Sequence, residues 1–427
     1  MLKSQTLSDE IVTLLEHNRN TIQSIVYHSN YLNVLRQQPI WDILGSMTRL
    51  RHLELQYVMK DILHRGQNPS QGEAFAKICE RLETMHLISC TLGDWPELEQ
   101  GGRQGRFSKM KQLEFTSVND ASAQLQMISQ CPVLEDLTWC PQPTSSSSFP
   151  TQDFVHYLYL TRSTSCLKRL NLEGCEIPES DAAAIIAQLP ASCNHLTFHC
   201  SHFGLLSITA LAAAAPQQSD FSLTLIQGIP SHLTHGLLSS CPNLQYLLPP
   251  CRVIATDLLA APWVASRLVK LELRLSFVAD LPPELGHSVI YEQLSRLVSL
   301  QELCLDEVIP HAETTDMDLK FLFSARAPPP GSIEKVEPEI EIPGSLDFSL
   351  ENGMGVLESL SQLRRLDLRS LQVLRMGQPE ALWMDTHWPA LTSLSVRGFN
   401  HDSRQQRKVL DFLSKTRPEL DISIGQK

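Results

Sequence analysis

The chain has 427 residues, of which 42% are hydrophobic and 19% charged, a composition typical of folded proteins rather than disordered ones. Its formal net charge of −12 argues against a nucleic-acid binder or a binder of anionic membranes, because both need a basic surface. No apolar run reaches the roughly 18 residues that cross a bilayer, and residues 1–20 lack the apolar stretch of a signal peptide. Eleven cysteines, a sparse and odd number, favour reduced thiols, so we expect a cytoplasmic or nuclear protein.

The first segment, residues 1–21, has the spacing of one amphipathic helix. Its apolar side carries Leu7, Ile11, Leu14 and Leu15, and Ser8 is available as a cap. We expect this segment to be an N-terminal helical cap or a partial first repeat.

From residue 22 to residue 305 the spacing Leu-x-x-Leu-x-Leu recurs, with other apolar residues in the looser copies. From Ile22 to Leu300 the copies begin 24 to 33 residues apart, which is the period of a leucine-rich repeat. The copies up to residue 305 begin at or near Ile22, Leu50, Leu82, Met110, Leu134, Leu167, Cys193, Leu244, Leu268 and Leu300, with one further weak copy around Leu223 and Leu225. Later copies begin at or near Leu363, Leu391 and Leu420.

Each copy predicts a short strand followed by a helix. The last two apolar positions lie two residues apart and so share one face of a strand. A helical segment follows, as at residues 182–189, where Asp181 is a candidate N-cap. Because one repeat cannot bury its own apolar face, neighbouring repeats must stack. The sequence therefore predicts an α/β leucine-rich-repeat solenoid, a right-handed superhelix or horseshoe with a parallel sheet on its concave face.

A long interruption separates the main array from the C-terminal repeats, residues 343–427. Residues 306–342 are rich in proline and acidic residues and predict an inserted loop. This loop can be a hinge, a partner-binding loop or a neutral insertion. Just after it, Leu346, Phe348 and Leu350 can form one degenerate strand.

Motifs of catalytic chemistry are missing from the sequence. It contains no GxSxG, Walker A, HExxH or CxxC pattern, so we expect neither an enzyme nor a cofactor. The densest set of possible metal ligands is Cys193, His195, His199, Cys200 and His202. On a strand, His195 and His199 would lie about 13 Å apart, at ~3.3 Å per residue, too far to share one zinc ion. We therefore expect no metal site here.

The repeats also carry a specific signature. Leu82–Cys90 and Leu167–Cys175 both follow Leu-x-x-Leu-x-Leu-x-x-Cys, and Cys131-Pro132 and Cys241-Pro242 mark returns from helix to strand. The array resembles the ribonuclease-inhibitor-like repeats of F-box leucine-rich-repeat proteins, in their divergent fungal type. The resemblance implies that the repeats hold a protein partner or substrate, and that the protein belongs to a cullin-type ubiquitin ligase through its Skp adaptor.

The chain departs from that family at its start. Only 21 residues precede Ile22, fewer than an F-box needs, so we expect no recognisable F-box ahead of the repeats. The sequence Leu281–Leu285 (LPPEL) resembles an F-box opening, but it lies where a repeat helix is expected.

Residues between the leucine positions point to the concave face, and from Lys270 onward many are charged. Such a strip suits a protein partner with matching charges, although any strand that faces water also carries polar residues. The chain is thus interpreted as a protein-interaction module, with substrate recognition for a cullin-type ligase as the resemblance implies. A non-degradative scaffold or inhibitor that binds a partner on the concave face is the alternative. The predicted partner-binding residues are Lys270, Glu272, Arg274, Glu302, Asp306, Arg365, Asp367, Arg369 and Arg397.

Overall fold

The structure is a computed structural model of the whole chain, and it divides into two compact units, Met1–Gln227 and Gly228–Lys427. The residues that it describes are 10, 12–28, 38–57, 69–90, 106–118, 121–141, 149–172, 175, 177–199, 203–214, 221–226, 229–276, 282–307, 346, 348–368, 376–397 and 404–425.

The first unit is built from parallel strands that pair in chain order. Residues 12–17 form a helical turn ahead of the first strand. The strands are β1 (Ser24–His28), β2 (His52–Gln56), β3 (Thr84–Ile88), β4 (Gln112–Val118), β5 (Asp136–Pro141), β6 (Arg169–Asn171), β7 (His195–His199) and β8 (Phe221–Ile226). Between them lie the helices α2 (Gln38–Ser46), α3 (Pro69–Cys79), α4 (Ala121–Ser129), α5 (Thr151–Thr161), α6 (Glu179–Gln188) and α7 (Leu205–Ala214).

The second unit repeats this plan, again with parallel strands paired in chain order. Its strands are β9 (Leu244–Ile254), β10 (Lys270–Ser276), β11 (Glu302–Glu307), β12 (Arg365–Leu368), β13 (Ser393–Arg397) and β14 (Asp421–Gly425). Its helices are α8 (Ser231–Ser240), η4 (Ala255–Leu259), α9 (Pro283–Ser295), η6 (Met354–Ser359), α11 (Gln378–His387) and α12 (Arg404–Thr416), of which η4 and η6 are 3₁₀ helices.

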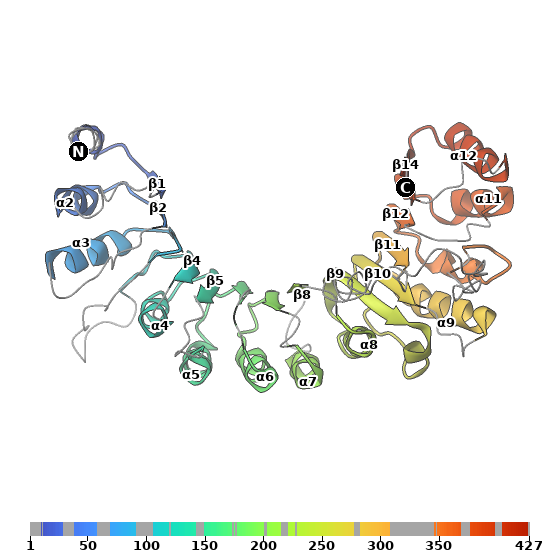
Figure 1. Cartoon of the computed structure of the whole chain (residues 1–427), viewed down its shortest axis with the longest axis horizontal. Coiled ribbons are helices and arrows are strands. Elements are labelled where there is room, and N and C mark those ends of the chain that lie inside the picture. The colour runs from blue at the N-terminus through green and yellow to red at the C-terminus, as the bar shows by residue number, and fades with distance from the viewer. Residues whose placement is uncertain are drawn as a thin grey trace, which may run out of the picture. The chain divides into compact units, whose positions relative to one another are not determined.

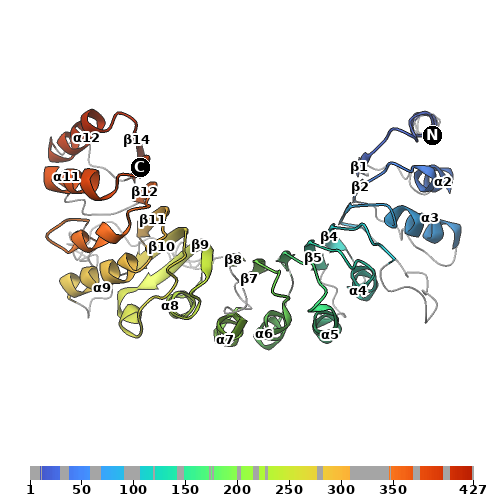
Figure 2. The ribbon, with the colours of Figure 1, turned by 180° about the vertical axis from the view of Figure 1, so that it is seen from behind.

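Within each unit the strands lie side by side on one surface and the helices cover the other. Figure 1 shows this for α4 to α7, which follow one another below β4 to β8 in this view, and Figure 2 shows the same arrangement from behind. The repeat leucines lie between the two layers: Leu53, Leu170, Leu271 and Leu366 are at most 1% exposed. Every repeat copy predicted from the sequence contributes a strand, and the α/β leucine-rich-repeat solenoid is confirmed.

Two structural features, one of the backbone and one of a side chain, recur after the strands of the first unit. Tyr57, Ser89 and Ser117, which occupy the same place in successive repeats, have positive φ angles of 58°, 52° and 54°. This left-handed conformation turns the chain out of the strand toward the next helix. One place further along, the Cys90 thiol donates to the carbonyl of Leu55 in the preceding repeat (3.2 Å). Cys175 donates in the same way to Trp139 (2.9 Å). The cysteine of the repeat signature thus joins neighbouring repeats.

Local details of the sequence prediction differ from the structure at two places. Helix α6 begins at Glu179, so Asp181 lies in its first turn and is not the N-cap, where Pro178 stands instead. There its charge still favours the helix N-terminus. No strand includes Leu346 or Phe348, because β11 pairs directly with β12. Both side chains are buried, and the Phe348 ring packs against Tyr291 and Trp388.

The other predictions about segments have mixed outcomes. Pro283 and Leu285 begin helix α9, as expected for a repeat helix, rather than opening a separate domain. Asp306 and Glu307 belong to β11, and the rest of the predicted loop 306–342 lies outside the described residues. Leu14, expected on the packed side of the first helix, is 63% exposed. No helix among the described residues is long and apolar enough to span a membrane.

Candidate functional site

The surface of interest is the inner face, which we define as the side chains of alternate strand residues that point away from the helices. The pairing register of the parallel strands aligns these side chains into two rows in the first unit. The first row comprises His52, Thr84, Gln112, Asp136, Arg169, His195 and Ser222. The second comprises Glu54, His86, Glu114, Thr138, Asn171, Thr197 and Thr224. Each row crosses strands that are distant in sequence, so groups from many repeats meet on one surface.

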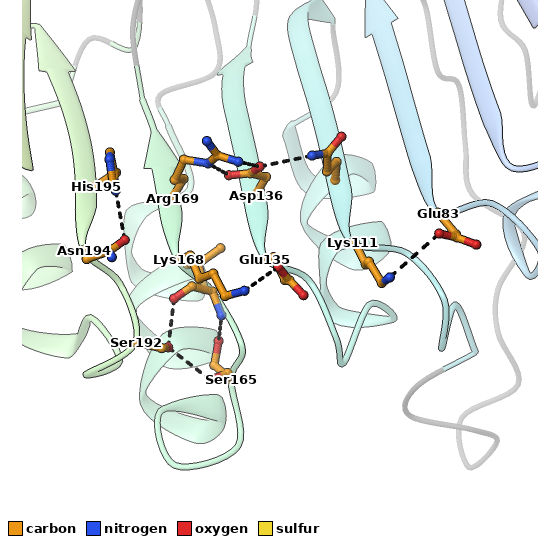
Figure 3. A network of polar contacts seen from close by, with 12 residues as sticks. Glu83, Lys111, Glu135, Asp136, Ser165, Lys168, Arg169, Ser192, Asn194 and His195 are labelled. Atoms are coloured by element: carbon orange, nitrogen blue, oxygen red, sulfur yellow. Dashed lines mark hydrogen bonds and ion pairs between the residues drawn. The ribbon is translucent and has the colours of Figure 1, made fainter. Parts of the chain in front are cut away.

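The first row is joined by hydrogen bonds. Thr84 donates to Gln112 (3.3 Å), and Gln112 donates to the Asp136 carboxylate (3.3 Å). From the other side, Arg169 holds the same carboxylate with two guanidinium nitrogens, Nε and Nη2 (Figure 3). Such a fork fixes both groups more firmly than a single contact does. The row therefore presents an ordered pattern of donors and acceptors.

These strands border a cavity of 390 Å³ on the inner face of the first unit. Its walls carry both signs of charge, from Glu114, Asp136 and Arg169, together with the imidazoles of His86 and His195. Thr138, Asn171, Thr197 and Thr224 complete the polar lining. A cavity with this lining suits polar or charged groups of a partner better than apolar ones.

A second set of ion pairs runs along the edge where the strands begin. Glu83 lies 3.6 Å from Arg51 and 3.8 Å from Lys111, and Glu135 accepts a hydrogen bond of 2.7 Å from Lys168 (Figure 3). The hydrogen bond from Lys168 lowers the pKa of the Glu135 carboxyl. Exposed pairs of this kind add little stability. Their effect here is to alternate positive and negative charge along the edge.

The pKa of the His195 imidazole depends on burial and on the charges of its neighbours. Desolvation lowers its pKa, Arg169 lowers it further, and Asp136 opposes them. A lowered pKa means that the folded state favours the neutral ring. Its contribution to stability is therefore present above the unfolded value of about 6.5 and is lost as the pH falls through the folded pKa.

We expect Arg169→Gln to raise the pKa of His195. The substitution removes the positive charge that opposes protonation and leaves Asp136 to favour it. An NMR titration of the His195 ring protons in the two proteins measures the change. An identical pKa in the variant would show that Arg169 does not act on this ring.

Histidines and glutamates gather at the other end of the same face. The Nδ1 atom of His86 lies 3.7 Å from a Glu54 oxygen and 3.8 Å from a Glu114 oxygen. The His52 ring meets the His86 ring edge-on, with centroids 5.3 Å apart. Desolvation lowers the pKa of His52, as does the neighbouring His86, while Glu54 raises it.

The second unit contains the strip predicted from the sequence, and register brings much of it together. Lys270 on β10 pairs with Glu302 on β11, which pairs with Arg365 on β12. The ammonium of Lys270 lies 3.3 Å from the Glu302 carboxylate. These residues, with Glu272 and Asp367, line a cavity of 110 Å³. Charges of opposite sign thus alternate across three strands.

The remaining predicted residues differ in how accessible they are. Arg274 and Arg365 are exposed, and Asp306 is half-buried beside Arg274 in the register. Asp367 is only 5% exposed, so a partner would reach little of its carboxylate. Arg397 ends β13, but its side chain lies outside the described residues, as does all of Arg369.

The partner-binding residues predicted from the sequence all lie in the second unit, and Asp136 and His195 of the first unit are not among them. The signal was present, because both occupy the same place in their repeats as Arg169 and Lys270. What the sequence did not reveal is that Asp136 meets both Gln112 and Arg169, since that depends on three strands lying in register.

The cysteine and histidine set around residue 195 does not converge in the described part of the chain. Cys193 is buried in the core, and burial raises its pKa to about 12, whereas His195 lies on the exposed inner face. A protonated thiol is not a nucleophile at neutral pH. Burial likewise raises the pKa of Cys241 and Cys251 to about 12. Cys200, His202 and the side chain of His199 lie outside the described residues.

Comparisons with known proteins add little beyond these observations. No model of a known family matches the sequence, and no curated protein matches it either. Among solved structures, the leucine-rich repeat-containing protein LegL7 from Legionella pneumophila is similar at 15% identity and a TM-score of 0.34, over 84% of this chain and 97% of that one. The mouse RP105/MD-1 complex is similar at 12% identity and a TM-score of 0.34, over 94% and 75%. At these values the likeness carries no argument about function.

Proposed function

We propose that this chain is a protein-binding module that holds its partner on the inner faces of its repeats. The observation that carries the proposal is the cavity of 390 Å³ in the first unit, lined by charges of both signs. Its side chains are held in place before a partner arrives, as Asp136 is by Arg169 and Gln112. Groups that are already ordered lose less conformational entropy on binding. The strip at Lys270, Glu302 and Arg365 is a second contact region of the same kind.

As a finer proposal, the partner is a substrate presented to a cullin-type ubiquitin ligase, reached through its Skp adaptor, in the cytoplasm or nucleus. The support is the resemblance of the repeats to those of F-box proteins. The alternative is a non-degradative scaffold or inhibitor that uses the same inner face. Both need a protein partner, and neither needs catalytic chemistry.

Charge reversal on the inner face tests the module. We expect Arg169→Glu or Arg365→Glu to reduce recovery of the main partner about tenfold, a loss of ~1.4 kcal/mol of binding free energy. The controls Lys77→Glu on α3 and Lys415→Glu on α12 make the same change of charge at exposed helical positions away from the inner face. Quantitative mass spectrometry of the tagged chain, purified from its own cells with the proteasome inhibited, measures recovery.

Two results separate the outcomes of this experiment. Equal loss in the helix variants and the inner-face variants would argue that net charge, not the inner face, governs binding. Recovery of the Skp adaptor and a cullin with the partner, and a longer partner half-life without the chain, favours the ligase. A partner recovered without any ligase component, and with an unchanged half-life, favours the scaffold.

A further inference from the structure

We propose that the inner face of the first unit binds a transition-metal dication of the zinc type through His52, Glu54 and His86. Nothing in the sequence motifs indicated this site, because its ligands come from two successive repeats. The inference goes beyond the proposed function, since it concerns the isolated chain and needs no partner.

The three donor groups already lie close together. The Nε2 atom of His52 is 3.9 Å from the Glu54 carboxylate, and Nδ1 of His86 is 3.7 Å from it. Donor atoms of all three residues lie within 4.8 Å of one another. Tetrahedral zinc with ligands at about 2.0–2.2 Å has neighbouring donors about 3.3 Å apart. Small rotations of half-buried side chains therefore suffice to bring these atoms around one ion.

The pairing of the parallel strands β2, β3 and β4 positions these donor residues. Glu54 on β2 lies directly opposite His86 on β3, and His86 lies opposite Glu114 on β4. His52 and Glu54 are two residues apart on one strand, so both point from the same face. The site therefore rests on paired strands rather than on loops, and rigid elements position metal ligands most accurately.

Neighbouring side chains orient the carboxylates toward the histidines. Gln56 donates a hydrogen bond to Oε1 of Glu54, which leaves Oε2 facing both imidazoles. Thr116 holds Oε1 of Glu114 in the same way (3.0 Å), and Oε2 then lies 3.8 Å from His86. Such outer hydrogen bonds are typical of metal sites, where they set the orientation of the ligands. Glu114 is accordingly placed to act as a fourth ligand or to support His86.

The local charge also favours a cation. Among the described residues, the ion-pair partners of Glu54 and Glu114 are histidines, with no lysine or arginine paired to either carboxylate. Two half-buried carboxylates gathered at one place make a site where a dication would be favoured. Two imidazoles and a carboxylate form a donor set that suits zinc and its neighbours in the first transition row.

Calorimetric titration of the full chain with ZnCl₂ tests the site. The thiols are kept reduced throughout, and the number of free thiols is determined beforehand. We expect one Zn²⁺ bound per chain. In His52→Gln/His86→Gln this binding should be lost, and in Glu54→Gln it should weaken at least tenfold. Glu54→Gln keeps the shape of the side chain and removes only its charge, and circular dichroism verifies that each variant is folded.

His195→Gln is the matched control, because His195 is also an inner-face histidine but has no carboxylate within ion-pair distance among the described residues. It should bind Zn²⁺ as the unaltered chain does. A Co²⁺ titration adds a spectroscopic signature, in which nitrogen and oxygen ligands lack the charge-transfer bands of thiolate ligands. The proposal is overturned if the unaltered chain binds no Zn²⁺, if the double variant binds it equally well, or if thiolate bands accompany Co²⁺ binding.

Discussion

Replacing Arg417 with alanine is expected to lower the free energy of unfolding of the second unit by about 3–5 kcal/mol. The side chain is only 8% exposed, although it carries a full charge. Its guanidinium donates to the carbonyls of Trp388 (3.0 Å), Pro389 (3.1 Å) and Leu391 in the preceding repeat. Alanine would remove the guanidinium donor from all three carbonyls, and among the described residues only Trp388 would keep a backbone donor, the amide of Leu391 (3.0 Å). A buried polar group left unpaired costs about 1–3 kcal/mol.

The position of Arg417 explains why the effect should be large. The carbonyls it binds follow helix α11, where the chain returns to strand β13 and has few backbone donors left. Arg417 follows helix α12, so the side chain connects the last two repeats of the chain. Arg81 plays the same part in the first unit, donating to the carbonyls of Gly45 (2.6 Å) and Met47 (3.0 Å).

Urea unfolding, with hydrogen exchange of strands β13 and β14 as the local readout, measures the loss. Arg296→Ala is the control: its side chain is 43% exposed and pairs with Glu292 one helical turn away, so we expect a change below about 0.5 kcal/mol. Arg417→Lys should fall between the two, because one ammonium cannot reach all three carbonyls. A cost below about 1 kcal/mol for Arg417→Ala would mean that water replaces the guanidinium.

The fold could be predicted from the sequence because the leucine spacing within each repeat is enough to predict the strand of that repeat. Leu50, Leu53 and Leu55 are all at most 1% exposed, as the spacing required. The recurrent cysteine was visible too, but its contact was not: Cys90 reaches a carbonyl 35 residues earlier in the chain. Arg81 and Arg417 escaped notice for the same reason. A repeat pattern shows which residues face the core, but not which polar groups meet between stacked repeats.

The candidate site was only partly predictable for a related reason. Side chains alternate between the two faces of a strand, and this two-residue period placed Lys270, Glu302 and Arg365 on the inner face. The pairing register of the strands brings the three residues together. The two-residue period could not show that Asp367 is nearly covered, because that depends on the tertiary surroundings of β12. Nor could it show how close His86 lies to His52 and Glu54, since the offset between strands β2 and β3 is set by the stacking of repeats and not by either strand alone.

Replacing Trp139 with alanine is expected to destabilise the first unit by about 3–5 kcal/mol. The ring is fully buried on β5 and packs against Phe149 and Phe154, with centroids 4.7 Å and 4.9 Å away. Its Nε1 donates to Gln124 (2.7 Å), whose own amide donates to the carbonyl of Val118 (2.9 Å). Alanine would remove the apolar contacts and the hydrogen bond to Gln124, and it would open a cavity.

Trp139→Phe separates the two contributions. Phenylalanine keeps much of the ring packing but cannot donate to Gln124, so we expect a cost of about 1–3 kcal/mol, the usual range for removing one donor of a buried hydrogen bond. Tyr159→Ala removes an aromatic side chain that is 65% exposed on α5 of the same unit, and should change stability by less than about 0.5 kcal/mol. Urea unfolding with hydrogen exchange of β4, β5 and β6 measures all three. If Trp139→Phe costs as much as Trp139→Ala, the hydrogen bond to Gln124 outweighs the packing; if it costs nothing, packing alone holds this repeat in place.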